Sequence, residues 1–322
     1  GVNSALLSGA GGGYVAVEMV FIQFAGFTFG KSASAYATPW HGYPGNNNSF
    51  LMGGHDTVTG VNNIQYTAQF GNGVSATIGL DDPTVLERTQ LQNLSLGVNA
   101  SGNGTNAYGG THAPDIVGNI RVDQAWGLFQ ISGAAHLVNA SYNVVGTGGV
   151  PNGLSEVSGH PDDKWGGSVM AALQIKNIPT GPGDDFKIDV SYAKGNTKNV
   201  ISTSGGSPSF AMFGGTDRIG AYQSIGFGQT SDAVFLPGFL TGGATGDIKL
   251  TEAWGVRGAF NHNWDPFWST SFWGSYAGVR YNGDALDIFS AKGQYCTSFN
   301  VGKTLSADYS CNPDFNIAQV GM

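Results

Sequence analysis

The chain has 322 residues, of which 41% are apolar and only 11% are charged. A soluble domain usually carries roughly 25% charged residues, so a water-exposed surface of this size would be short of charge. Lys and Arg number 14 against 22 Asp and Glu, and the net charge of −8 without a basic cluster argues against nucleic acid as a partner. Glycine is abundant, at 52 residues, but no three-residue repeat rich in proline accompanies it, so a collagen-like chain is excluded.

The first 30 residues carry one charge, Glu18, and therefore raise the question of a signal peptide or a transmembrane helix. A signal peptide needs a basic first segment, which is absent, and the glycines at 9 and 11–13 disfavour a spanning helix. Residues 15–30 are instead rich in aromatic and β-branched residues on both sides of an Ala25–Gly26 turn. We expect two strands there.

The segment 64–81 shows the pattern on which the fold prediction depends. Residues 64–70 and 74–81 flank a short turn at 71–73, and successive side chains of a strand point to opposite faces. One face of this hairpin is Ile, Tyr, Ala and Phe followed by Val, Ala, Ile and Leu, whereas the other face carries Gln, Thr, Ser and Asp. A packed protein core cannot accept the second face without a partner for every polar group, so we expect water on that side.

Three further hairpins repeat this alternation. They cover residues 116–137, 169–192 and 254–281, with turns at 123–127, 177–184 and 262–266. The four hairpins give 29 positions on the apolar face (64–80, 116–137, 169–192 and 254–260), and none is charged, where about three charges would be expected at the average frequency. A lipid-facing surface excludes charge because Lys or Arg at mid-bilayer costs ~2–4 kcal/mol. The buried face of a soluble sandwich would exclude charge as well.

The lengths of the connections separate these two interpretations. The four turns are short, whereas the connections between hairpins are long; the long connections are 31–60, 82–114, 139–165, 195–249 and 282–316. Outer-membrane barrels show this asymmetry, with short turns at one end and long loops at the other. The sequence therefore predicts an all-β fold, a transmembrane antiparallel up-and-down β-barrel with about 10–12 strands in this chain.

Aromatic residues near the predicted strand ends fit the same prediction. They are Phe70, Trp126, Trp165, Trp254, Trp264, Trp268 and Trp273. Such residues form girdles at the two membrane interfaces of a barrel. Packing against the turns is the alternative role for each of them.

Three segments resemble a known family. They are FIQFAGFTFG (residues 21–30), APDIVG (113–118) and WGVRGAF followed by NWDP (254–260 and 263–266). Together they resemble the alphaproteobacterial general porins of the rhizobial and Brucella type, over residues from about 14 to the C-terminus. The resemblance implies a Gram-negative outer-membrane location, a trimer of 16-stranded barrels, and passive diffusion of small hydrophilic solutes and ions.

Two features depart from that family. The last residue is Met322, where an aromatic residue would be expected at the end of the final barrel strand, and no signal peptide precedes the first strands. We therefore expect residues 1–322 to form a single porin domain that is incomplete at both ends. We expect its long connections 82–114, 139–165, 195–249 and 282–316 to be external loops.

The resemblance also places candidate selectivity residues. It implies that residues 31–60 form a constriction loop folded into the lumen, with Lys31 and Asp56 as its charged residues. The alternation puts further charges on the lumen side of the wall: Arg121, Lys176, Lys187, Arg257, Asp81, Asp123 and Asp189. Opposed charges across a narrow pore set its ion preference. The alternative for each wall cation is an ion pair within the barrel, such as Lys187 with an Asp on a neighbouring strand, which stabilises the wall without selecting ions.

The remaining motifs carry little chemistry. Cys296 and Cys311 lie fifteen residues apart in one loop-like stretch, which suits a disulfide in an oxidising compartment, with two free thiols as the alternative. The histidines have no ligand spacing, so we predict no resident metal, although loop binding of Ca²⁺ by the paired acids at 162–163 and 184–185 stays open. No nucleophile, base and acid constellation is evident. We predict no cofactor and no enzyme activity.

The leading functional hypothesis is a water-filled diffusion channel whose partners are outer-membrane lipid, small hydrophilic solutes and ions, and two further copies of the chain. A second hypothesis is a non-conducting outer-membrane barrel that acts as an adhesin or structural protein through its long loops. A third is a soluble glycine-rich sandwich that binds sugars through aromatic loops. Conductance in a bilayer separates the first from the second, and extraction without detergent would favour the third.

Overall fold

The computed structural model of the protein describes residues 17–45, 51–55, 60–84, 87–94, 104–141, 160–201, 209–213, 225–236, 246–300 and 311–322. Over these ranges the chain is almost entirely β, with two helical segments, η1 (Thr197–Asn199) and α4 (Ala291–Asn300). In this part of the chain no helix has the length and apolar character needed to cross a membrane.

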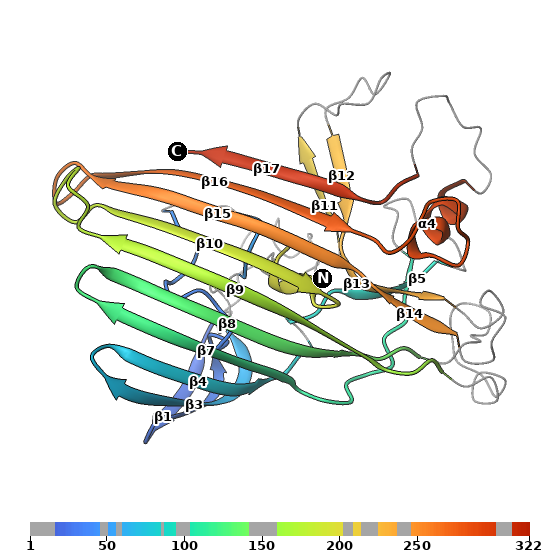
Figure 1. Cartoon of the computed structure of the whole chain (residues 1–322), viewed down its shortest axis with the longest axis horizontal. Helices are drawn as coiled ribbons and strands as arrows, with labels where there is room; N and C mark the ends of the chain where they lie inside the picture. The colour runs from blue at the N-terminus through green and yellow to red at the C-terminus, as the bar shows by residue number, and fades with distance from the viewer. Residues whose placement is uncertain are drawn as a thin grey trace, which may run out of the picture.

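One large sheet dominates the molecule (Figure 1). Its eleven strands follow one another in chain order, and each pairs antiparallel with the next. They are β1 (Val20–Phe24), β2 (Phe27–Ser32), β3 (Val61–Gly71), β4 (Val74–Asp81), β7 (Asp115–Gln124), β8 (Gly127–Val138), β9 (Lys164–Lys176), β10 (Asp185–Lys194), β15 (Glu252–Asn263), β16 (Ser269–Arg280) and β17 (Phe315–Gly321). The predicted all-β, antiparallel, up-and-down fold is confirmed, and eleven strands fall within the predicted range.

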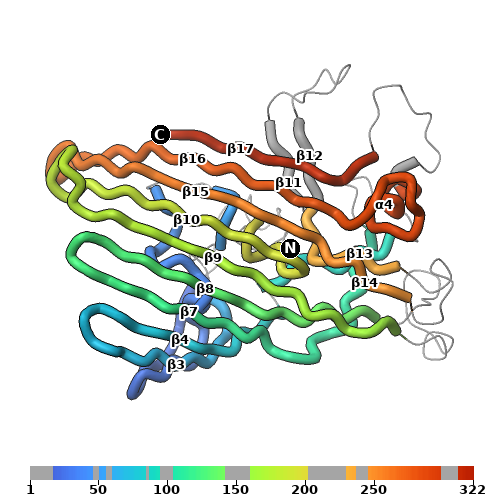
Figure 2. The backbone as a smooth tube through the Cα atoms, in the orientation of Figure 1, coloured from blue at the N-terminus to red at the C-terminus, as the bar shows by residue number. Residues whose placement is uncertain are grey.

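Short turns and long connections lie at opposite ends of this sheet, as the backbone tube shows (Figure 2). The turn between β1 and β2 has Ala25 and Gly26 at φ 51° and 88°, and Asn72 and Gly73 repeat this at 49° and 73°. Two successive positive φ values give the left-handed turn whose twist matches that of the flanking strands. At Gly73 a Cβ would lie 1.9 Å from the Asp123 carbonyl oxygen, so only glycine lets neighbouring hairpins approach so closely.

The two faces of the large sheet are inverted relative to a soluble protein. None of the 29 apolar-face positions is buried, and Ile78 and Val169 are 63% and 57% exposed. On the opposite face Gln130 and Ser132 are each 2% exposed and Arg257 is fully buried. The predicted assignment of the apolar stripe to the outside is therefore the one the structure has.

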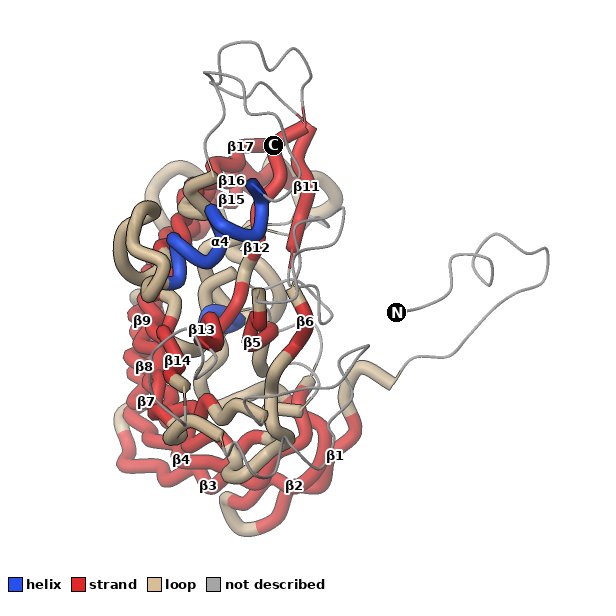
Figure 3. Tube along the Cα trace, turned by 90° about the vertical axis from the view of Figure 1, so that its right-hand side faces the viewer, coloured by secondary structure: helices blue, strands red, loops and turns tan. Residues whose placement is uncertain are grey.

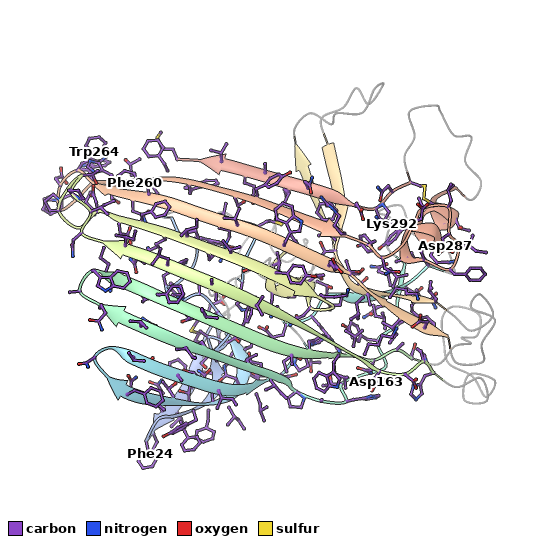
Figure 4. All side chains as sticks on the ribbon, viewed as in Figure 1. Phe24, Asp163, Phe260, Trp264, Asp287 and Lys292 are labelled. Atoms are coloured by element: carbon purple, nitrogen blue, oxygen red, sulfur yellow. A yellow bond between two sulfur atoms is a disulfide. The ribbon has the colours of Figure 1, made fainter. Side chains whose placement is uncertain are left out.

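Aromatic and charged residues lie near both ends of the sheet. In Figure 4, Phe260 and Trp264 lie at the end with the short turns, whereas Asp163, Asp287 and Lys292 lie at the opposite end. Five of the predicted girdle aromatics are exposed and the other two, Trp254 and Trp273, are half-buried; the exposed ones are Phe70, Trp126, Trp165, Trp264 and Trp268. Exposed aromatic rings at strand ends suit a membrane interface.

A second, smaller sheet lies within the curve of the large one (Figure 3). We call it the inner sheet; its order is β14-β13-β5-β6, from strands β5 (Gln90–Asn93), β6 (Thr105–Asn106), β13 (Ser231–Leu236) and β14 (Asp247–Leu250). A separate pair joins β11 (Ser209–Phe213) to β12 (Ile225–Gln229). Parts of the connections 82–114 and 195–249 are therefore strands that were not predicted, because the segments are short and the parallel pairing of β5 with β13 joins two distant connections.

Candidate channel lining and inward segment

The connection between β2 and β3 runs across the polar face of the large sheet. We call its described residues, 33–45 and 51–55, the inward segment. Its backbone accepts hydrogen bonds from wall amides: Asn119 Nδ2 donates to Ala35 O (2.7 Å), Gln130 Nε2 to Ala37 O (2.7 Å) and Asn261 Nδ2 to Pro44 O (3.1 Å). Since these amides come from β7, β8 and β15, the inward segment crosses much of the width of the sheet.

Aromatic side chains of the inward segment pack on the wall. Tyr36 is fully buried and Trp40 is nearly so, in a cluster with Val117, Met170 and Ala172 from β7 and β9. Burial raises the pKa of the Tyr36 hydroxyl, so it stays protonated. Apolar contact and amide hydrogen bonds together hold the segment against the wall.

Arg257 joins the inward segment to the wall through a buried ion pair. It lies opposite Asp189 in the β10–β15 register, and both side chains are fully buried. Its Nε donates to both carboxylate oxygens, at 3.0 and 3.1 Å. Its Nη1 and Nη2 donate to the carbonyl oxygens of Leu51 (3.3 Å) and His55 (3.1 Å). The guanidinium thus binds the wall carboxylate and the inward segment at the same time.

Glycines make that contact sterically possible. A Cβ at Gly54 would lie 2.3 Å from Asp189 Oδ1, and a Cβ at Gly255 would lie 2.3 Å from the Cα of Gly53. The opposite edge of the segment is held as well, because Gly53 N donates to Val200 O at 3.0 Å. Any side chain at these positions would push the segment away from the wall.

The other predicted wall cations are also paired. Arg121 and Lys176 both contact Asp123, at 3.1 and 2.9 Å, and the three side chains are partly exposed near the short-turn end. Lys187 contacts Asp185, two residues away on its own strand, at 3.5 Å. The ion pairs left open by the sequence are therefore present for all four wall cations, counting Arg257 with Asp189.

The remaining predicted site residues lie apart from these pairs. Lys31 Nζ donates to Val17 O at 2.6 Å, at the end of β2. Asp81 is fully buried at the end of β4, opposite Asp115 of β7. Asp56 lies outside the described residues.

A buried polar network at the end with the long connections was not predicted. His136 Nδ1 lies 2.6 Å from Asp115 Oδ1, and His136 Nε2 lies 3.2 Å from the Tyr108 hydroxyl, which donates to Asp232 Oδ2 at 2.9 Å. The strand alternation places Asp115 and His136 on the polar face, so that part was readable from the sequence. Tyr108 and Asp232 come from long connections, where no residue pattern predicted that they would join this network.

The inward segment also contacts the connection 82–114. His55 Nε2 lies 3.6 Å from Glu87 Oε1, and its Nδ1 lies 3.0 Å from Asn199 Oδ1. Burial raises the pKa of the Glu87 carboxyl well above its usual value, reinforced by the nearby charges of Asp81 and Asp115. The inward segment therefore contacts the wall and two other connections.

Two further predicted features concern the loops. Cys296 of α4 and Cys311 form a disulfide, which closes the loop after the helix. Within the described ranges, no group of three or more His, Cys, Asp and Glu side chains is arranged to hold a metal ion.

The chain resembles known proteins in sequence and in structure. The model of the porin subfamily matches residues 2–322. Among solved structures, the chain is similar to the outer membrane channel DcaP of Acinetobacter baumannii, with 13% sequence identity and a TM-score of 0.47; the match covers 81% of this chain and 54% of that one, so the chain spans about half the length of that channel. A search of curated proteins gives no match. Because the family match extends over essentially its whole length, the chain belongs to the porin subfamily and is a protein of the outer membrane.

Proposed function

We propose that this porin-family chain forms the wall of a water-filled channel through which small hydrophilic solutes and ions diffuse passively. The inversion of the two faces carries the proposal. Leaving a large apolar side chain in water forgoes roughly 1.5–3 kcal/mol of burial energy, and this sheet exposes such side chains on nearly every strand. Contact with lipid would explain the exposed apolar face, and contact with water would explain the polar face.

The inward segment would narrow the channel. Its support is the set of contacts on β7, β8 and β15 and the clamp by Arg257, which hold it on the polar side of the wall. A constriction needs such attachment because a loose loop would not present a constant opening to solutes.

The charges that face solutes would be the partly exposed ones. Arg121, Asp123 and Lys176 are 33–43% exposed, whereas Asp189 and Arg257 are fully buried beneath the inward segment. Charge acts on a passing ion most strongly where water and the ion can approach. We therefore assign ion preference to the first group, together with Lys187, and positioning of the inward segment to the second. Lys31, Asp56 and Asp81 remain candidates from the resemblance.

The resemblance also supports finer proposals about the assembly. They are a homotrimer and a 16-stranded barrel of the alphaproteobacterial general type. The family match supports transport and gives no support to catalysis. Mass measurement of the protein extracted in mild detergent tests the trimer, and a mass corresponding to one chain would contradict it.

Reconstitution into a planar bilayer tests the channel itself. The full-length porin should produce stepwise increases in conductance, and the heat-unfolded protein should produce none. A folded protein that inserts without conducting would instead favour the adhesin or structural barrel, for which the loops packed at one end of the wall are the supporting observation.

Labelling tests the orientation of the wall. A photoreactive probe confined to the lipid phase should mark Ile64, Phe186 and Val190 and spare Gln65, Thr67 and Asp189. The reverse pattern would show that the polar stripe touches lipid, and the transport account would fail with it.

A further inference from the structure

The inner face of the large sheet changes character toward the end with the long connections. At mid-wall it is polar, as at Gln130 and Ser132. At this end, beside the buried Asp115–His136 pair, several buried inward positions are apolar: Val138, Ala193, Ala253, Ala277, Val279 and Ile317. A water-filled channel does not need such a lining, because uncovered apolar surface in water is unfavourable. Another part of the chain must cover these residues.

The inner sheet provides that cover. Ala233 and Phe235 of β13 pack in one buried cluster with Val138 of the wall, whereas Val234 and Leu236 pack in another with wall residues of β10, β15 and β16. Alternate residues of a strand point to opposite faces, so β13 is packed on both sides, and all six of its residues are buried. The inner sheet is thus part of a packed core at this end of the wall.

Asp232 holds this sheet in place through four hydrogen bonds. Its Oδ2 accepts from Thr89 N (2.8 Å) and from the Tyr108 hydroxyl (2.9 Å). Its Oδ1 accepts from the backbone N (2.8 Å) and the hydroxyl (3.0 Å) of Thr197. The carboxylate is fully buried, so these donors replace the water it would otherwise bind.

Those donors connect Asp232 to separate parts of the fold. Thr89 directly precedes β5, and Thr197 lies in η1 after wall strand β10. Tyr108 continues to the wall through His136 and Asp115, and the Arg88 guanidinium carbon lies 4.5 Å from the centre of its ring. One side chain therefore joins the inner sheet to β7, β8 and β10.

We propose that the inner sheet is a second size filter, in series with the inward segment, and that Asp232 is the residue that positions it. The proposal rests on the channel function given above. Its support is the buried, hydrogen-bonded attachment of the sheet on the inner side of the wall, since a filter for solute size requires a fixed boundary. The inward segment and the inner sheet have separate attachments, Arg257 for the first and Asp232 for the second.

The test measures the entry of two sugars into liposomes that contain the full-length porin, a pentose and a tetrasaccharide. Asp232→Ala removes all four hydrogen bonds, so the flux of the large sugar relative to the small one should rise several-fold. This ratio does not depend on how much protein inserts, so a variant that merely assembles poorly would lower both fluxes and leave the ratio unchanged.

Thr197→Val is the milder variant. It preserves the shape of the side chain and removes the hydroxyl that bonds Asp232 and Thr89, so the ratio should rise by a smaller factor. Thr84→Val is the matched control because Thr84 also donates its hydroxyl to an aspartate, Asp82, but on the exposed surface and outside the strands of the inner sheet. Its ratio should equal that of the unmodified protein.

The outcomes separate the two proposals. An unmodified porin that passes neither sugars nor ions would overturn the channel function. An unmodified porin that passes the small sugar, with an unchanged ratio in Asp232→Ala and Thr197→Val, would overturn the second filter alone. If Asp232→Ala does not assemble, the ratio for Thr197→Val decides.

Discussion

Asp189 and Arg257 face each other across β10 and β15, and the guanidinium that contacts the Asp189 carboxylate also donates to two carbonyl oxygens of the inward segment. A buried ion pair adds little net stability by itself, because desolvation of both charges offsets their attraction. Here the pair has a second consequence, since the remaining N–H groups of the guanidinium bind backbone carbonyls of the inward segment. We interpret it as the clamp that sets the position of the inward segment.

Replacement of Arg257 by Met should leave Asp189 buried without its cation and release Leu51 and His55. The expected cost in the free energy of unfolding is about 3–5 kcal/mol, as for other broken buried pairs. Unfolding by denaturant in detergent measures it. Lys194→Met is the matched control, because Lys194 pairs with Glu252 across the same two strands but in an exposed position, where such pairs contribute ~0–1 kcal/mol. Equal losses in the two variants would contradict the clamp.

Replacement of Gly54 by Ala should displace the inward segment without altering any charge. The added methyl would meet Asp189 and the Arg257 guanidinium, whereas at Gly133 the nearest atom to an added Cβ is 3.9 Å away. We expect Gly54→Ala to change the single-channel conductance and increase its fluctuations, and Gly133→Ala to leave both as they are. Identical traces for Gly54→Ala and the unmodified protein would mean that this contact does not shape the channel.

Ion preference should respond to the partly exposed cations. Removing both Arg121 and Lys176 by Ala substitution leaves Asp123 unpaired at the short-turn end, so the reversal potential in a salt gradient should shift toward cation preference. The shift should shrink as the salt concentration rises, because the Debye length falls to about 3 Å at 1 M. Lys194→Ala, which removes a cation from the outward face, should leave the reversal potential unchanged. An unaltered potential in the double variant would argue that these residues serve only as an ion pair.

A fall in pH should weaken the contacts of Asp184, which join the turn at 177–184 to the turn at 262–266. Desolvation acts to raise the pKa of the Asp184 carboxyl. Hydrogen bonds from Asn263 N, Thr180 and His262 outweigh it and lower this pKa to about 2. A carboxyl with a lowered pKa stabilises the fold above its unfolded pKa of roughly 4, and that stabilisation is lost as the pH falls toward 2.

Thermal unfolding between pH 5 and pH 2 would measure this effect, over the window set by the unfolded value of roughly 4 and the folded value of about 2. Across that window the unfolding temperature of the unmodified protein should fall further than that of Asp184→Asn, whose amide does not titrate there. Parallel curves for the two proteins would rule out a contribution from Asp184.

The alternation of side chains was sufficient to predict the wall. Successive residues of a strand point to opposite faces whatever the rest of the fold does, so residues such as Ile64 and Gln65 revealed which side is apolar before any contact was known. The short turns were equally local, because Ala25–Gly26 and Asn72–Gly73 adopt the backbone that a tight hairpin needs. The interpretation as a channel followed from those two local properties.

Which side chains of the polar face contact each other depended on tertiary structure. Lys187 and Asp185 share a strand and a face, so their contact could have been read from the sequence, but the pairing of Asp189 with Arg257 required the register of β10 against β15. The inner sheet required still more, since β5 and β13 pair in parallel from connections far apart in the chain. Local residue patterns determine which face of each strand is apolar. Contacts between distant segments depend on how the whole chain folds.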